Sequence, residues 1–257
     1  DRINFTDVPS AKHQFRIDSA PSANLIQIDE WSAPVKAFPA NSSPDTYQEL
    51  QIMANEISQI GDKSEDILEK YDDILQSFEK ICRKKGLNFP KKYMSNLIEE
   101  AAEIIIKLKY KYNRPRPYQL APILGIELRA GSIESANTPS FPSGHACQSK
   151  LVANVLCIIY PECIADFQKM AEKIAYSRYI GGVHFPSDLA YGDELADWMV
   201  NYVVMPDQVD ESRTIGQRND LPNISPNPVL KGDDEDERLI KIRQFKGTIN
   251  DYKRYWD

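Results

Sequence analysis

Helical hydrophobic periodicity, interrupted at intervals by proline and glycine, is the feature that most constrains the fold of this chain. Ser43 is a good N-cap and Pro44 suits the first helical position, and apolar side chains then recur at helical spacing. We therefore expect a helix from residue 44, a second over about 63–84, and a third from about Pro90 to Tyr112. Three later segments show the same pattern and are also expected to be helical: 143–160, 161–178 and 186–204.

The distribution of these segments predicts a single-domain, all-α helical bundle, because no segment shows convincing strand alternation. Residues 1–43 contain four prolines and few periodic apolar positions, so we expect an irregular N-terminal segment. Residues 44–205 form the predicted helical catalytic core. Residues 206–257 are interpreted as an extended linker followed by a C-terminal helix, which belongs to the same domain or forms a subunit contact. A homo-oligomer through this helix is consistent with Tyr252, Tyr255 and Trp256.

Charge and hydropathy exclude two classes of protein. The longest apolar runs are about half of the 18 to 20 residues that span a bilayer, so we expect a soluble protein without a membrane span. A net charge of −7 argues against nucleic acid as a partner. The chain begins at Asp1, which indicates a removed leader or a trimmed sequence. The four cysteines contain no C-x-x-C pair and are expected to be structural thiols, so periplasmic, secreted and cytoplasmic locations all stay open.

The first motif with chemical potential is Pro142-Ser143-Gly144-His145, which stands directly before an apolar helical segment. Ser143 is a good N-cap, so the N–H groups of Gly144 and His145 lie in the first turn at the positive end of the helix dipole. Such an end binds anions, glycine admits a ligand close to the backbone, and His145 adds a proton donor. The alternative is a capped helix with an exposed histidine.

The second motif joins Arg178, His184 and Asp188, with spacings of six and four residues. Pro186 suits the start of a helix, which places Asp188 in its first turn and His184 just before it. A carboxylate one turn from an imidazole can accept the ring N–H, fix the tautomer and leave the other nitrogen as a nucleophile. The Gly181-Gly182 pair allows the chain to turn so that Arg178 and His184 face one point. The alternative is an ordinary arginine with a capping aspartate and a surface histidine.

The third motif is "KLKYKYNRPRPY", where Lys109 and Arg116 flank an expected helix end and can reach a common anion. Lys107 and Arg114 have the same spacing, so spacing alone does not choose between the two pairs. Basic residues at a helix end also occur simply as a solvated face that complements the dipole.

Taken in order, the motifs read K-x6-R-P, P-S-G-H and S-R-x5-H-x3-D. This pattern resembles the phosphate-binding signature of the type-2 phosphatidic acid phosphatase superfamily, which includes soluble bacterial class A acid phosphatases and the vanadium haloperoxidases. The chain is closest in kind to the acid phosphatases, and the matched span covers about 109–188. The register Lys109/Arg116 is preferred because "RPRP" resembles the family's usual extra arginine. The matched positions are Lys109, Arg116, Pro117, Pro142, Ser143, Gly144, His145, Ser177, Arg178, His184 and Asp188.

The resemblance implies a helical bundle of the acid phosphatase/vanadium haloperoxidase type and a role for each site residue. Lys109, Arg116 and Arg178 would clamp the nonbridging oxygens of a phosphoryl group. Ser143 and the N–H of Gly144 would complete the cradle, and catalysis would consist largely of positioning and electrostatic stabilisation.

Two histidines would carry the chemistry by the same resemblance. His184, held by Asp188, would attack phosphorus and form a phosphohistidine. His145 would protonate the leaving alkoxide and then activate water, so the two rings must hold opposite protonation states and a bell-shaped pH profile is expected. His13 is the remaining histidine and lies in the N-terminal segment. The two motif histidines alone cannot furnish a typical His-rich metal site, so we expect neither a metal nor a cofactor.

The leading functional prediction is a soluble, metal-independent phosphatase that hydrolyses small phosphate monoesters. The alternative is a vanadium-dependent haloperoxidase with vanadate bound at His184, although members of that group are generally longer chains. A non-enzymatic anion-binding protein is a third possibility. Leaving-group specificity is expected to come from loops that include 118–141. Aromatic residues near the motifs could stack on a substrate ring or simply pack as wall: Tyr112, Tyr118, Phe141, Tyr179 and Phe185.

Overall fold

The computed structural model describes residues 3–20, 22–28, 33–34 and 36–205. The predicted linker and C-terminal helix of 206–257 lie outside the described residues. Within the described ranges the fold is a helical bundle without strands, and its one extended pairing is an isolated antiparallel bridge between Ile26 and Val203. The prediction of an all-α fold is therefore confirmed for this part of the chain.

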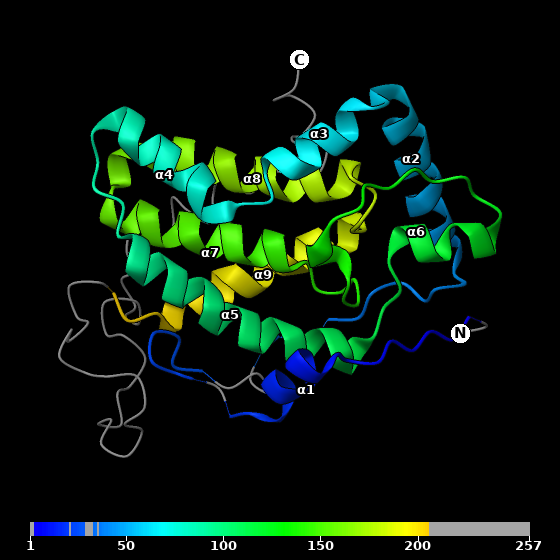
Figure 1. Cartoon of the computed structure of the whole chain (residues 1–257), viewed down its shortest axis with the longest axis horizontal. Helices are drawn as coiled ribbons and strands as arrows, with labels where there is room; N and C mark the ends of the chain where they lie inside the picture. The colour runs from blue at the N-terminus through cyan, green and yellow to red at the C-terminus, as the bar shows by residue number, and fades with distance from the viewer. Residues whose placement is uncertain (1–2, 21, 29–32, 35, 206–257) are drawn as a thin grey trace.

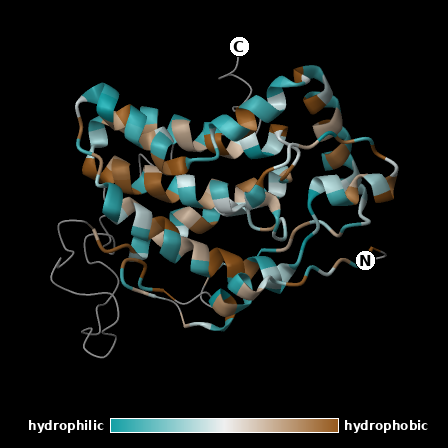
Figure 2. Ribbon diagram, viewed as in Figure 1, coloured by the Kyte–Doolittle hydropathy of each residue, from teal (hydrophilic) through white to brown (hydrophobic). Residues whose placement is uncertain are grey.

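Helix α7 (Gly144–Ile159) lies in the middle of the bundle (Figure 1). It packs against α8 (Ile164–Ile180), α9 (Pro186–Met199) and α5 (Lys91–Tyr112). Residues 151–157 of α7 are completely enclosed, as expected for a helix that is apolar on most of its circumference. Figure 2 shows this hydrophobic stretch between the neighbouring helices, whereas hydrophilic residues predominate on the visible side of α4 (Ile74–Lys85).

The remaining elements cover this centre and connect its helices. Helix α2 (Pro44–Ile60) begins as the sequence predicted, because Ser43 Oγ accepts the Thr46 N–H and Pro44 occupies the first position. Helix α8 follows a 3-10 turn, η4 (Pro161–Cys163), and α9 ends in another, η5 (Val200–Tyr202). The predicted loop region also contains three short helical elements: α6 (Pro117–Leu120), η2 (Pro122–Leu124) and η3 (Glu134–Ala136).

The prediction of one continuous helix over 63–84 is wrong. The segment forms α3 (Lys63–Lys70) and α4, and the connection between them contains Asp72 and Asp73. The Asp73 carboxylate accepts the Gln76 N–H at 2.8 Å and starts α4 as its N-cap. Aspartate competes with the helix for backbone donors, so two adjacent aspartates can end one helix and cap another without disturbing the apolar periodicity.

The N-terminal segment is more ordered than predicted. Helix α1 (Ala11–Asp18) forms within it, capped by Ser10, and packs against α5. Beyond α1, the buried Glu100 of α5 accepts hydrogen bonds from three consecutive backbone N–H groups, which are those of Asn24, Leu25 and Ile26, at 2.8–3.1 Å. One carboxylate therefore provides the acceptors for a stretch of backbone that lies outside any helix.

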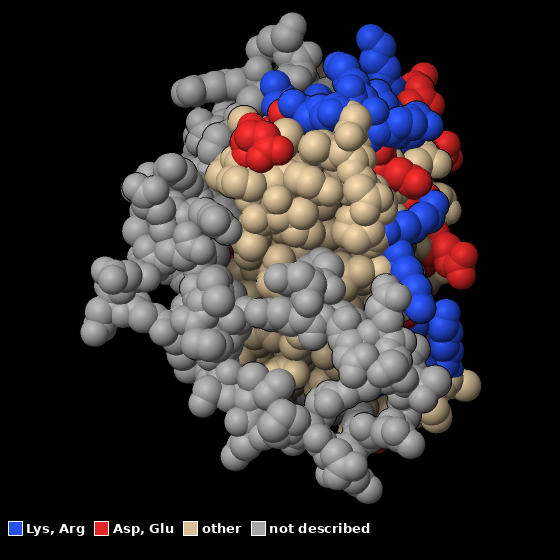
Figure 3. Space-filling model, turned by 90° about the vertical axis from the view of Figure 1, so that its left-hand side faces the viewer, with Lys and Arg blue, Asp and Glu red and all other residues tan. Residues whose placement is uncertain are grey.

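Charged side chains at one end of the bundle lie apart from the motif residues. Figure 3 shows the side of the bundle that lies on the left in Figure 1, where lysine and arginine gather along the edge of an uncharged area. The last turn of α4 carries the exposed Arg83, Lys84 and Lys85. Lys91 and Lys109 are at opposite ends of α5, about 27 Å apart at 1.5 Å per residue.

Among the described residues, no helix combines the length and the apolar character that a bilayer span requires.

We expect Glu100→Ala to lower the free energy of unfolding by about 2–4 kcal/mol, because three backbone donors lose their acceptor. Urea denaturation measures this difference. Glu99→Ala is the matched control, since the Glu99 side chain is 63% exposed and its loss changes stability by at most about 0.5 kcal/mol. Equal effects of the two substitutions would contradict the role of Glu100.

Candidate active site

The motif residues converge because several helix ends meet on one side of α7. The Ser143 N–H donates to the Asp188 carbonyl at 3.1 Å, which joins the starts of α7 and α9. Gly192, one turn further along α9, permits this approach, since a Cβ there would lie 2.9 Å from the Ser143 carbonyl oxygen. The C-terminal end of α5, which carries Lys109, and the start of α6 at Arg116 complete the ring of helix ends.

Lys109 and Arg116 are both buried and point to the same region. The Lys109 ammonium donates to the carbonyl oxygens of Pro139 and Ser140. The Arg116 guanidinium donates to the Val183 carbonyl at 2.8 Å, and one of its nitrogens lies 2.8 Å from His184 Nε2. The Lys107 ammonium instead donates to the Ser19 carbonyl. The structure thus brings Lys109 and Arg116 together beside His184, which is the register favoured by the sequence pattern.

Burial gives the cations of this region an unfavourable electrostatic environment. It lowers the pKa of Lys109 well below its usual value, and the positive charge of Arg116 adds to the effect. Burial also lowers the pKa of Arg116 and that of Arg178 to about 10 each. Many of the acceptors of these three side chains are neutral carbonyls, so the region retains excess positive charge. A bound oxyanion would compensate that charge through charge-assisted hydrogen bonds.

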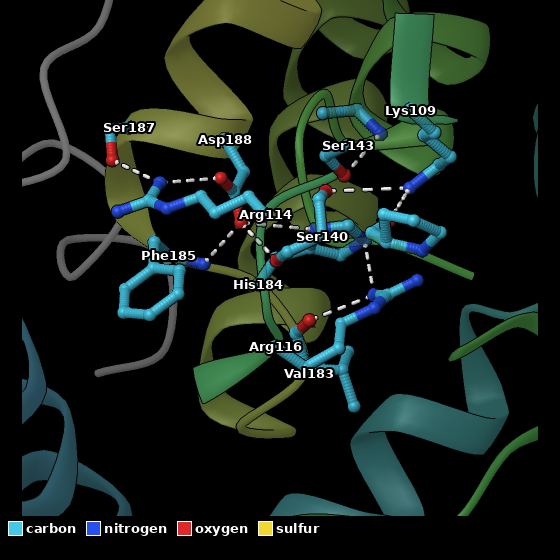
Figure 4. Close-up of polar contacts among 12 residues, drawn as sticks. Lys109, Arg114, Arg116, Ser140, Ser143, Val183, His184, Phe185, Ser187 and Asp188 are labelled. Carbon is cyan, nitrogen blue, oxygen red and sulfur yellow. Dashed lines mark hydrogen bonds and ion pairs between the residues drawn. The ribbon is translucent and has the colours of Figure 1, made fainter. Parts of the chain in front are cut away.

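His184 and Asp188 form the predicted pair at the start of α9 (Figure 4). The Asp188 carboxylate lies 3.4 Å from His184 Nδ1, while Nε2 faces the Arg116 guanidinium. Because a carboxylate accepts and a guanidinium only donates, the ring carries its proton on Nδ1 and presents the Nε2 lone pair. Burial lowers the pKa of His184 well below its usual value, and Arg116 lowers it further, so the ring is neutral.

Arg114 is a functional residue that the sequence analysis used only to choose the register. It is completely buried, donates to Asp188 at 2.6 Å, and also binds Ser187 and Glu49. Its guanidinium stacks over the Phe185 ring at 3.9 Å. The alternating "RPRP" pattern is its sequence signal, because the residue before each proline is held out of helical geometry and both arginines therefore stand in the extended connection after α5. Arg114 therefore neutralises Asp188, and Arg116 is left to face the ligand region.

The start of α7 matches the prediction for the P-S-G-H motif. The buried Ser143 accepts the Ala146 N–H with its Oγ, so it is the N-cap, and its own hydroxyl hydrogen is available for donation. A Cβ added at Gly144 would meet no protein atom closer than 3.8 Å, which leaves space beside the first helical N–H groups. The last member of the motif, His145, has a 15% exposed side chain.

His145 and Arg178 meet at a residue that the sequence analysis did not select. His145 Nε2 lies 3.1 Å from both the backbone carbonyl and the carboxylate of Asp72, and Arg178 donates to the same carboxylate at 2.8 Å. Asp72 belongs to the α3–α4 connection, so the unexpected helix break places it there. The hydrogen bond from His145 and the charges of both partners lower the pKa of Asp72 although burial opposes them. Burial and Arg178 lower the pKa of His145.

The segment between Arg178 and His184 connects the two histidine environments. The Val183 N–H donates to the Arg178 carbonyl, and the Val183 carbonyl accepts from Arg116. Gly182 has a φ of 69°, and a Cβ there would lie 2.5 Å from the Arg129 carbonyl oxygen. The predicted turn at the glycine pair thus requires glycine at Gly182 for both its backbone angle and its space.

The aromatic residues near the motifs are mostly packing residues. Phe141 stacks on Tyr191 at 4.8 Å and contacts Tyr112 edge-on, and Phe185 and Tyr179 are buried. The partly exposed Tyr118 donates to the Ala136 carbonyl in the predicted specificity loop. The four cysteines are buried free thiols. In the part of the chain that the structure describes, no three His, Cys, Asp or Glu side chains are grouped so as to hold a metal ion.

A family model and a solved structure agree with this architecture. Residues 94–205 match the PAP2 superfamily and include every motif position. A crystal structure of the first bacterial vanadium-dependent iodoperoxidase is similar, with a TM-score of 0.51, 19% identity and coverage of 71% of this chain. The aligned region spans about half (54%) of the iodoperoxidase chain. A transmembrane PAP2-type phosphatidylglycerolphosphate phosphatase from Bacillus subtilis also aligns, with a TM-score of 0.43, 17% identity and coverage of 63% of this chain and 85% of its own. No curated protein sequence matches the chain.

We expect Gly182→Ala to reduce the free energy of unfolding by about 2–4 kcal/mol and to weaken binding of inorganic phosphate, because the new Cβ displaces the segment before His184. Chemical denaturation and titration calorimetry measure the two effects. Gly86→Ala is the matched control: Gly86 also has a positive φ, 69°, but open space around it, so about 1 kcal/mol is lost and phosphate binding is retained. Unchanged phosphate binding in Gly182→Ala would contradict this role.

Proposed function

We propose that this chain, whose residues 94–205 match the PAP2 superfamily, is a phosphatase that hydrolyses small phosphate monoesters through a phosphohistidine intermediate. The observation that carries the proposal is the combination of three buried cations with a neutral imidazole whose Nε2 lone pair faces one of them, Arg116. An oxyanion fits the cations, and phosphorus is the electrophile that such a nitrogen attacks.

Substrate binding gives Lys109 and Arg116 a stronger hydrogen-bond acceptor than they have in this structure. Lys109 and Arg116 donate to neutral carbonyls in this structure, and a phosphoryl oxygen is the better acceptor because it is charged. The Arg116 guanidinium also lies in the direction of the His184 Nε2 lone pair and blocks it in this structure. When a phosphoryl group binds, one of its oxygens accepts the hydrogen bond from Arg116. The Nε2 lone pair of His184 is then free to attack the phosphorus atom in front of it.

Two displacements at phosphorus complete the reaction. In the first, His184 Nε2 forms a bond to phosphorus as the bond to the leaving oxygen breaks, and His145 transfers a proton to that oxygen. In the second, His145 removes a proton from water, the water oxygen attacks phosphorus, and the bond to His184 breaks to release phosphate. Asp188 holds the Nδ1 proton of His184 throughout and stabilises the positive charge that forms on the ring.

The alternative activity uses the same residues. Vanadate has the charge and shape of phosphate, so Lys109, Arg116, Arg178 and Ser143 would hold its oxygens and His184 Nε2 would ligate the metal. Bound there, vanadate would supply peroxide activation for halide oxidation. No feature of the described residues favours this chemistry over hydrolysis, and the assay below distinguishes them.

We expect turnover of p-nitrophenyl phosphate that is inhibited by vanadate and unaffected by a chelator. His184→Ala should lower kcat by at least about 10³-fold, because the nucleophile is lost. His13→Ala is the matched control, since His13 lies on α1 and contacts Tyr110 rather than the site. Full turnover by His184→Ala would refute the nucleophile, and vanadate-dependent halide oxidation without phosphate release would establish the alternative.

The pH profile should have its maximum below about pH 6.5. His184 must be neutral, so the rate falls as the pH drops through its pKa; His145 must be protonated, so the rate falls as the pH rises through its pKa. Burial lowers both pKa values, and that of His184 further, so a window between them lies on the acid side. Initial rates with phenyl phosphate, corrected for ionisation of the substrate, measure the profile. A maximum above pH 7 would contradict these environments.

A further inference from the structure

The Asp72 carboxylate links two groups that the proposed reaction needs separately. It lies 2.8 Å from the buried Arg178 guanidinium and 3.1 Å from His145 Nε2. The Ser135 hydroxyl donates to the same oxygen from the opposite loop. Its side chain is 43% exposed, so it stands at the border between the buried site and solvent.

The two contacts of His145 determine which ring nitrogen carries a proton. The Asp72 backbone carbonyl can only accept, and so can its ionised carboxylate. Nε2 therefore carries a hydrogen in both the neutral and the charged ring. Nδ1 has no hydrogen-bond partner among the described residues, which makes it the nitrogen that gains and loses a proton and the one available to a ligand.

The environment of His145 mirrors that of His184 with the nitrogens exchanged. In His184 the carboxylate faces Nδ1 and Nε2 reacts, whereas in His145 the carboxylate faces Nε2 and Nδ1 is available. The charged groups that face His145 are Asp72 from the α3–α4 connection and Arg178 from α8. Without Asp72, the ring would face only a positive charge and would resist protonation.

We propose that Asp72 is the positioning residue of the proton donor: it fixes the His145 ring through Nε2–H and allows Nδ1 to carry the proton that is transferred to the leaving group. The role rests on the proposed phosphatase reaction. Asp72 keeps its own charge throughout: the proton moves from Nδ1 to the leaving oxygen, and the Nε2 proton stays on the ring. Because the same carboxylate binds Arg178, the clamp and the donor are held in one arrangement.

A histidine titration tests this role without any turnover. The chain has three histidines, so the ring signals of His145 can be assigned by NMR and followed with pH. Asp72→Asn keeps the size and an acceptor oxygen but removes the charge, and we expect the pKa of His145 to fall by about one unit. Asp73→Asn is the matched control, because asparagine also caps α4 and the Asp73 carboxylate accepts from the Gln76 N–H rather than from His145; the His145 titration should not move.

Kinetics supply the second readout. In Asp72→Asn the alkaline limb of the rate profile should shift to lower pH by the same amount while the acid limb, set by His184, stays. Asp72→Glu should restore part of the shift. A uniform loss of rate at all pH values with an unchanged His145 titration would overturn the proposal and leave Asp72 a structural anchor of Arg178. If the wild type hydrolyses no phosphate ester, the proposed function fails, and the titration alone still supports or overturns the role of Asp72.

Discussion

The site depends on how the negative charge of one buried carboxylate, that of Asp188, is neutralised. Asp188 is fully enclosed, and burial by itself would raise its pKa. Arg114 opposes this with its charge, and hydrogen bonds from His184 and Ser140 add to it, so the pKa lies well below its usual value and the group stays ionised. Because these donors come from three segments of the chain, the ionised Asp188 fixes the position of α9 relative to the end of α5.

This compensation also explains why the remaining cations are available. Arg114 is balanced by Asp188 and Glu49, and it is held between aromatic rings. Among the residues that the structure describes, Lys109 and Arg116 form no ion pair with a carboxylate and bind backbone carbonyls instead. A protein with a net charge of −7 therefore contains a buried cluster of positive charge. Buried charge of this kind lowers stability, and such costs are characteristic of binding sites.

The local parts of the site were predictable and the long-range parts were not. Spacing alone placed His184 and Asp188 one helical turn apart, and Ser143 was recognisable as a cap. Asp72 contacts Arg178 across 106 residues, and periodicity could not reveal it because the apolar pattern continues through the break between α3 and α4. The pair Asp72-Asp73, followed by Gln76, was the one local signal of that break.

Two histidines can hold opposite protonation states at one pH only if their surroundings differ. His184 faces Arg116 and Lys109, is nearly inaccessible, and shares its carboxylate with Arg114 and Ser140, so little negative charge remains to favour its protonation. His145 faces one cation, Arg178, and it also faces Asp72, whose half-exposed carboxylate and backbone carbonyl both lie within 3.1 Å of Nε2. The pKa of His184 is thus lower than that of His145 because Asp188 is also bound by Arg114 and Ser140, whereas the half-exposed Asp72 faces His145 and one cation. The break between α3 and α4 thus gives His145 an aspartate of its own, and the two histidines differ in the charge that surrounds them.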